Sequence, residues 1–138
     1  MTATRAWVAL GSNLGDRHAY LALARERLAA LPSTVLRAAS AIESTEPLGG
    51  LTQPPYLNQM VVLDTELGPR ELIAGFQRIE AEAGRERRVR WGSRTLDLDL
   101  VRYDELTLDE PGLVLPHPGL PERAFWQREL QELRRMGW

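Results

Sequence analysis

Residues 95–103 read Thr-Leu-Asp-Leu-Asp-Leu-Val-Arg-Tyr, and this stretch decides how the rest of the chain can fold. Apolar and polar residues alternate through it, which is typical of a β-strand with one buried face. Because successive side chains of a strand point to opposite faces, Asp97 and Asp99 share one face and the neighbouring leucines share the other. The stretch therefore predicts a strand that buries its leucines and presents two carboxylates on the opposite side.

The segments before this stretch predict an alternation of strands and helices. Trp7–Leu10 is a short apolar run that stops at a glycine, and residues 35–44 and 57–67 read as two further strands, of which residues 37–41 are ambiguous. One helix is expected from a cap at Asp16 to about Leu31, and a second from Pro69 to Gly84. Apolar stripes support both helices: Tyr20, Ala24, Leu28 and Leu31 in the first, and Leu72, Phe76, Ile79 and Ala83 in the second.

The order of these elements predicts the fold class. It is βαββαβ, followed by a short helix expected at residues 127–136 as a C-terminal appendage. Helices packed on one face of a mainly antiparallel sheet form an α+β sandwich of ferredoxin-like type. A length of 138 residues fits one domain, residues 1–138, with a two-layer core. Such a fold by itself implies no function.

The composition excludes several classes of chemistry. No apolar run approaches the roughly 20 residues that span a bilayer, and a net charge of −2 does not favour nucleic acid or a membrane surface. Cysteine is absent and only two histidines are present, so neither a disulfide framework nor a zinc site is expected, and we expect a cytoplasmic protein. All 17 basic residues are arginine, which excludes Schiff-base and P-loop lysines. Any phosphate would therefore be bound by guanidinium groups.

Asp97 and Asp99 form the candidate metal site. Their carboxylates would lie roughly 6 to 7 Å apart along a strand, close enough to share hard cations such as Mg²⁺. Residues 85–94, just upstream, contain five arginines, and magnesium combined with guanidinium groups suits a polyphosphate. The alternatives are an edge strand with a solvated acidic face, and a surface loop whose arginines pair with Glu82 and Glu86. The residues alone do not decide between these interpretations.

Tyr56 and Asn58 form a second candidate site. In a strand they share one face, where a flat heterocycle could stack on the ring and pair with the amide. A core tyrosine beside a turn asparagine explains the same two residues without any ligand.

Taken together, five segments in order resemble the family of 6-hydroxymethyl-7,8-dihydropterin pyrophosphokinases, over residues 6 to about 125. These segments are Ala9–Asp16, Pro54–Asn58, Arg90–Leu100, Leu115–Pro118 and Glu122–Phe125. The resemblance implies transfer of pyrophosphate from ATP to the hydroxymethyl group of 6-hydroxymethyl-7,8-dihydropterin, with release of AMP, in folate biosynthesis. Several features depart from the family pattern, two of them at the substrate sites. Glu46 stands where a proline is usual, and no arginine near residues 110–112 matches a nucleotide contact of some members.

The resemblance also implies the roles of individual residues. Asp97 and Asp99 would bind two Mg²⁺ ions against the phosphates of the co-substrate ATP, with Arg85 and Arg94 as further catalytic residues. The ATP site would be lined by Gln77, Glu80, Arg90, Trp91, Arg94, His117 and Arg123. The pterin site would be formed by Asn13, Thr45, Pro47, Leu48, Tyr56, Asn58 and Phe125. The partners would be these small-molecule substrates, and the chain would be a monomer or a weak homo-oligomer.

Two other functions remain open from the sequence. A four-stranded α+β sheet with aromatic residues and a basic loop is also typical of RNA-binding modules, although the net charge and the acidic pair argue against one. A non-catalytic ferredoxin-like regulatory domain is the second alternative, and it predicts no ATP binding.

Overall fold

A computed structural model of the chain describes residues 3–46, 55–84 and 95–138. Its strands are β1 (Thr4–Ser12), β2 (Thr34–Ala39), β3 (Glu43–Thr45), β4 (Tyr56–Thr65), β5 (Asp97–Tyr103), β6 (Leu108–Glu110) and β7 (Leu113–Leu115). Its helices are α1 (Arg17–Ala29), α2 (Pro69–Glu82) and α3 (Ala124–Arg135), with a 3-10 turn at Leu120–Glu122. Within these described ranges, no helix combines the length and the apolar character needed to cross a membrane.

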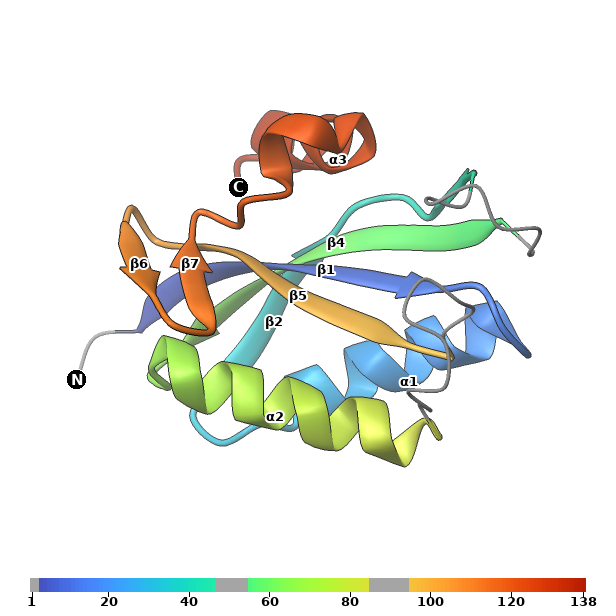
Figure 1. Ribbon diagram of the computed structural model, residues 1–138, viewed down its shortest axis with the longest axis horizontal. Coiled ribbons are helices and arrows are strands. Elements are labelled where there is room, and N and C mark those ends of the chain that lie inside the picture. Colours follow the sequence, from blue (N-terminus) through green and yellow to red (C-terminus); the bar gives the residue numbers. More distant parts are fainter. Residues whose placement is uncertain (1–2, 47–54, 85–94) are drawn as a thin grey trace.

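The centre of the molecule is an antiparallel sheet in the order β2-β4-β1-β5 (Figure 1). β1 lies between β4 and β5 and pairs with both along most of its length. β3 pairs with the start of β4, on the edge where β2 pairs further along. This strand order, with α1 and α2 on one face, confirms the predicted ferredoxin-like α+β fold.

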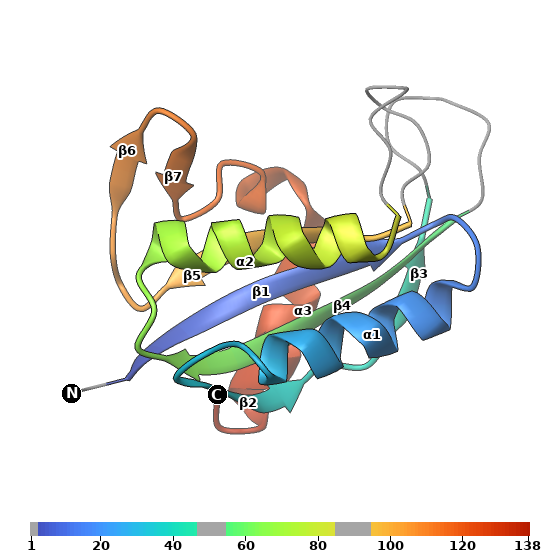
Figure 2. The same ribbon diagram turned by 90° about the horizontal axis from the view of Figure 1, so that it is seen from below.

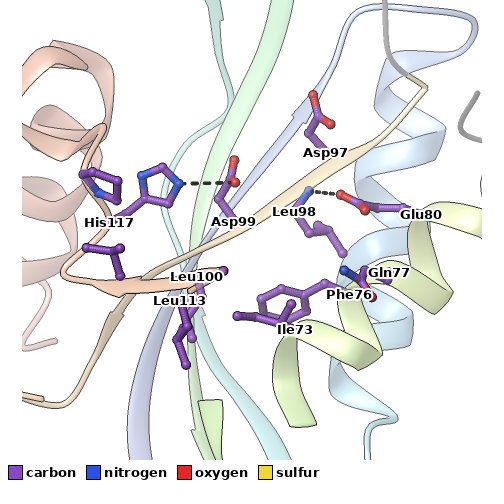
Figure 3. A pocket seen from close by; sticks show the side chains of 13 residues that line it. Ile73, Phe76, Gln77, Glu80, Asp97, Leu98, Asp99, Leu100, Leu113 and His117 are labelled. Atoms are coloured by element: carbon purple, nitrogen blue, oxygen red, sulfur yellow. Dashed lines mark hydrogen bonds and ion pairs between the residues drawn. The ribbon is translucent and has the colours of Figure 1, made fainter. Parts of the chain in front are cut away.

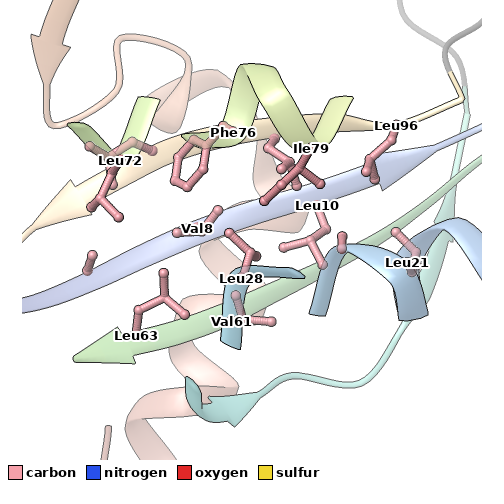
Figure 4. Close-up of a cluster of buried hydrophobic side chains, with 14 of the residues drawn as sticks. Val8, Leu10, Leu21, Leu28, Val61, Leu63, Leu72, Phe76, Ile79 and Leu96 are labelled. Atoms are coloured by element: carbon pink, nitrogen blue, oxygen red, sulfur yellow. The ribbon is translucent and has the colours of Figure 1, made fainter. Parts of the chain in front are cut away.

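The two faces of the sheet are covered by different helices (Figures 1 and 2). Under α1 and α2 lies the larger apolar core, in which Val8 and Leu10 of β1 contact residues such as Leu28 and Phe76 (Figure 4). The appendage α3 packs on the opposite face, where Trp126 and Leu133 meet residues of β1, β4 and β5. The molecule therefore has a third layer, which the expected two-layer sandwich did not include.

Helix ends follow the capping chemistry that the sequence predicts. The Asp16 carboxylate accepts a hydrogen bond from the Ala19 N–H at 3.1 Å at the start of α1. Pro69 begins α2, and Gly84 follows its end with a φ of +76°, a conformation that glycine adopts without steric cost. α3 begins three residues before the expected Gln127, because Trp126 in its first turn is buried against the sheet.

The strands differ from the expectation in two places. The single strand expected at residues 35–44 is divided into β2 and β3, because the hydroxyl of Ser40 accepts the Met60 N–H at 2.9 Å in place of a backbone carbonyl. A hairpin of β6 and β7 was not expected at all. It turns at Gly112, which has a φ of +75°, and buries Leu113 and Leu115 in the core.

Candidate active site

The candidate site lies along a row of residues that crosses three neighbouring strands. Gly11 of β1 pairs with Asn58 of β4 on one side and with Asp97 of β5 on the other. Because adjacent strands lie about 4.8 Å apart, the Cα atoms of Asn58 and Asp97 are separated by roughly 10 Å. In the neighbouring row Ala9 separates Met60 from Asp99. The register thus joins the two candidate sites that the sequence left separate.

The side chains of this row point to the α3 face of the sheet. Leu98 and Leu100 pack into the core under α1 and α2, so the alternation of β5 directs both aspartates to the opposite side. The side chain of Asp99 is 40% exposed, and Asp97 is half-buried. The sequence prediction that the two carboxylates share a face is therefore confirmed.

Gly11 forms the floor between the two halves of the row. A Cβ atom at this position would lie 3.3 Å from Asn58 Oδ1 and 3.6 Å from the Tyr56 ring. The missing side chain therefore leaves the space into which Tyr56 and Asn58 project. Sequence reasoning used Gly11 only as a turn signal. A glycine inside a strand is also a signal for close approach of another group.

On the β4 side, the predicted pterin residues Thr45, Tyr56 and Asn58 lie together. Asn58 is only 6% exposed, and its amide Nδ2 donates a hydrogen bond to Thr45 Oγ1 at 2.5 Å. Thr45 pairs directly with Tyr56 across the β3–β4 ladder. Asn13 is buried just beyond the end of β1, and Phe125 lies half-buried in the first turn of α3. Pro47 and Leu48 lie outside the described residues.

On the β5 side, His117 faces one of the aspartates (Figure 3). His117 Nε2 lies 3.5 Å from Asp99 Oδ1, while His117 Nδ1 accepts the Gly119 N–H at 2.9 Å. An Nδ1 that accepts a hydrogen bond leaves the proton of the neutral ring on Nε2, directed at Asp99. The rings of His117 and Trp126 lie perpendicular to each other, with centroids 4.9 Å apart. The imidazole is thus held from two sides before any ligand binds.

Gln77 and Glu80 of α2 line a cavity of about 410 Å³ beside β5, together with Asp97, Asp99 and His117. Its apolar lining comes from Ile73, Phe76, Leu98, Leu100, Leu113 and Val114. Gln77 is exposed, whereas Glu80 is 8% exposed and accepts the Leu98 N–H at 2.8 Å (Figure 3). Glu80 therefore also fixes the outer edge of β5, a contact that the sequence did not indicate.

Arg123 stands next to the histidine turn. Its guanidinium lies over the Trp126 ring at 4.4 Å from the centroid, and a Cβ at Gly119 would come within 3.0 Å of Arg123 Nη1. The other predicted phosphate and nucleotide residues, Arg85, Arg90, Trp91 and Arg94, lie outside the described residues. In the part of the chain that is described, no three or more His, Asp or Glu side chains gather as a set of metal ligands.

Comparison with known proteins gives a consistent result. Residues 7–135 match the family model of 7,8-dihydro-6-hydroxymethylpterin-pyrophosphokinase. The chain is 43% identical over 129 residues to a protein of Pseudomonas aeruginosa, covering 94% of this chain and 80% of that protein. It is 45% identical over 130 residues to one of Methylorubrum extorquens, covering 94% and 82%, and 41% identical over 128 residues to one of Bacillus subtilis, covering 93% and 77%. All three relatives are named 2-amino-4-hydroxy-6-hydroxymethyldihydropteridine pyrophosphokinase.

Proposed function

The chain belongs to the family of 7,8-dihydro-6-hydroxymethylpterin-pyrophosphokinases, and we propose that its active site has a phosphate half on β5 and a pterin half on β4. The enzyme transfers a pyrophosphoryl group from ATP to 6-hydroxymethyl-7,8-dihydropterin, a step of folate biosynthesis. The single observation that supports two separate halves of the site is the strand register at Gly11, in which Asn58 and Asp97 pair with opposite sides of one glycine.

In this proposal the phosphate half binds two Mg²⁺ ions through Asp97 and Asp99. The donor set fits, because magnesium takes one or two carboxylates and completes its octahedron with waters and substrate phosphates. Bound magnesium supplies charge neutralisation at the phosphate oxygens. The Nε2–H of His117 restrains the Asp99 carboxylate, and Arg85 and Arg94 are proposed to contact the same phosphates.

The nucleotide is proposed to lie in the cavity beside β5. Its apolar walls suit a flat base, and the exposed amide of Gln77 offers both a donor and an acceptor. Glu80 supports this site by fixing the Leu98 N–H, His117 lines the same cavity, and Arg123 lies next to the turn at Gly119. Arg90 and Trp91 complete the proposed ATP site.

The pterin is proposed to stack between Tyr56 and Phe125 and to be read by Asn58. The Asn58 amide is already oriented by Thr45, so its remaining donor and carbonyl oxygen are directed before the substrate arrives. The lack of a side chain at Gly11 lets Asn58 and Tyr56 lie close against β1. Asn13 and the backbone of Pro47 and Leu48 are assigned to the rim of this half-site.

The reaction then depends on placing two groups in line. The hydroxymethyl oxygen attacks the β-phosphorus, the bond from this phosphorus to the α–β bridging oxygen breaks, and AMP leaves. Phosphoryl transfer through a loose transition state requires positioning and charge stabilisation more than covalent help from the protein. The chain supports both needs, since one rigid sheet carries the acceptor site on β4 and the carboxylates on β5. We assign no described side chain as a general base, because the hydroxyl proton leaves late.

Incubation with magnesium, ATP and the pterin alcohol tests the assignment. AMP should appear in equal amount to the pyrophosphorylated pterin, as followed by anion-exchange chromatography. Formation of ADP would instead identify a simple kinase and would overturn the proposed attack on the β-phosphorus.

The remaining proposals concern partners and location. We propose a monomer or weak homo-oligomer that binds no nucleic acid, which the net charge of −2 supports. Sedimentation velocity and a titration with RNA at low salt test these two points. A cytoplasmic location fits an activity that consumes ATP, and fractionation of cells tests it.

A further inference from the structure

Glu129 of α3 carries a carboxyl group that the proposed reaction does not use. The residue is 2% exposed and lies on the face of α3 that packs against the sheet, close to Trp126 and Leu133 in the helix sequence. Among the described residues, no hydrogen-bond donor reaches either of its carboxyl oxygens. A buried carboxylate without a donor is costly, so the group needs a proton or a partner that supplies one.

The neighbour of Glu129 is another acid, Glu43 of β3. Burial, together with hydrogen bonding to Glu43 and repulsion from its carboxylate, raises the pKa of the Glu129 carboxyl to about 9. Arg128 and Glu132 act on the same group with opposite signs. Two carboxyl groups in contact can form a hydrogen bond only when one of them is protonated. Since Glu43 is only partly buried and Glu129 is fully buried, the proton belongs on Glu129.

Two further contacts attach the segment 41–45 to α3 beside this acid pair. Arg128 Nη2 lies 3.3 Å from Glu43 Oε1, and Glu132 Oε2 accepts the Ala41 N–H at 2.8 Å. Arg128 is well exposed, so its ion pair adds little on its own. The pair of Glu43 and Glu129 includes a fully buried carboxyl group and is therefore the contact most sensitive to a missing proton.

The segment that α3 holds is the one that orients the pterin half of the site. Glu43 pairs with Asn58 in the β3–β4 ladder, and Thr45, two residues later, accepts the hydrogen bond from the Asn58 amide. α3 itself carries Phe125 in its first turn. The contact between Glu129 and Glu43 therefore joins the two elements that carry the proposed pterin residues.

We propose that Glu129 is a positioning residue for the pterin site, which shares its carboxyl proton with Glu43 and so fixes β3 and Thr45 against α3. Loss of this proton places two negative charges in contact, and repulsion moves β3 away from α3. Asn58 then loses its orienting partner, while Asp97 and Asp99 on the far side of β1 are unaffected. The inference rests on the proposed pterin site.

The test compares the wild type with Glu129→Gln across a pH series. Glutamine has the shape of the protonated acid and donates to Glu43 at every pH, so it preserves the contact without titrating. From about pH 7 to about pH 10, we expect the KM for the pterin to rise roughly fivefold in the wild type, the effect of losing one buried polar contact. In Glu129→Gln the KM should stay within about twofold of its neutral value, and kcat should change equally in both proteins.

Glu105→Gln serves as the matched control, because Glu105 is exposed in a turn away from the site. The KM of this control for the pterin should match the wild-type KM at every pH. Any effect of titration of the pterin itself is the same in both proteins and cancels in the comparison. Glu43→Gln is a second variant, which removes the repulsion from the other side and should also flatten the KM profile. An identical rise of KM in the wild type and both glutamine variants would overturn the proposal.

Infrared difference spectroscopy of the ligand-free protein separates this inference from the pterin assignment. The carbonyl band of a protonated carboxylic acid should be present at neutral pH, vanish above about pH 9 and be missing in Glu129→Gln. Absence of the band from the wild type would refute the shared proton whatever the substrate does. A band that behaves as expected, with an unchanged KM in Asn58→Ala, would refute the pterin site alone.

Discussion

The two strands that flank β1 build opposite environments on the same face of one sheet. β5 lies at the edge of the described sheet, and its Asp97 and Asp99 remain partly exposed. β4 lies inside the sheet, and its Asn58 is buried with its amide already bonded to Thr45. An ionised carboxylate needs water or a metal to offset its charge, whereas a neutral amide can be buried once it is hydrogen-bonded. The position of a strand in the sheet thus decides which half of the site can hold ionised side chains.

Removal of a carboxylate from the β5 half should have the largest effect. We expect Asp97→Asn and Asp99→Asn each to lower kcat at least about 1,000-fold, because the charge that holds magnesium against the phosphates is lost. AMP release measures the rate, and circular dichroism checks that the fold survives. Asp109→Asn, on the exposed strand β6, is the control and should retain full activity. A variant of either active-site aspartate that keeps more than a tenth of the activity would contradict the metal assignment.

The matching change on the β4 half should act on the other substrate. We expect Asn58→Ala to raise the KM for the pterin roughly 30-fold, because the substrate and Thr45 both lose a hydrogen-bonding partner. The KM for MgATP should stay within about twofold, which steady-state kinetics with each substrate varied in turn would establish. An equal rise in both constants would show that the two halves are not separate.

A methyl group placed between the halves should have a smaller effect. In Gly11→Ala the new Cβ would lie 3.3 Å from Asn58 Oδ1, so the amide must shift by a few tenths of an ångström. We expect the KM for the pterin to rise about fivefold and the KM for MgATP to be unchanged. Gly68→Ala is the control, since its Cβ would make an ordinary contact with Glu71. A larger change in the KM for MgATP than in the KM for the pterin would show that Gly11 belongs to the phosphate half.

The buried carboxyl group of Glu129 should make the stability of the protein depend on pH. The pKa of Glu129 is about 4.5 in the unfolded chain and about 9 in the folded protein. Between these two pH values the native state therefore binds one more proton than the unfolded state. The free energy of unfolding should therefore fall as pH rises through this window, by at most about 1.4 kcal/mol per pH unit relative to Glu129→Gln. Urea denaturation of both proteins from about pH 5 to about pH 9 measures the difference. Parallel curves would show that Glu129 is ionised in the native protein.

The sequence predicted those features that depend on neighbours along the chain. Alternation in β5 was sufficient to place both aspartates on one face, and the caps of α1 and α2 were readable from Asp16 and Pro69. The hairpin β6–β7 was missed because strands of three residues are too short for a periodic pattern.

The features that the sequence could not predict depend on contacts between distant segments. No local pattern gives the register that puts Gly11 between Asn58 and Asp97, because it follows from how whole strands pack. Glu129 is similar. Its place among the apolar residues of an amphipathic helix was a readable signal, but its partner Glu43 lies in a strand far away along the chain.

The double pairing of Gly11 also has a consequence for quality control in the cell. Since side chains alternate along β1, a slip of one residue that turned Gly11 away from the active-site row would also pull Val8 and Leu10 out of the main core. Inactive register isomers would thus display the apolar surface that chaperones and proteases recognise. Chaperones and proteases that recognise only exposed apolar surface would therefore also remove molecules in which the two halves of the active site are misaligned.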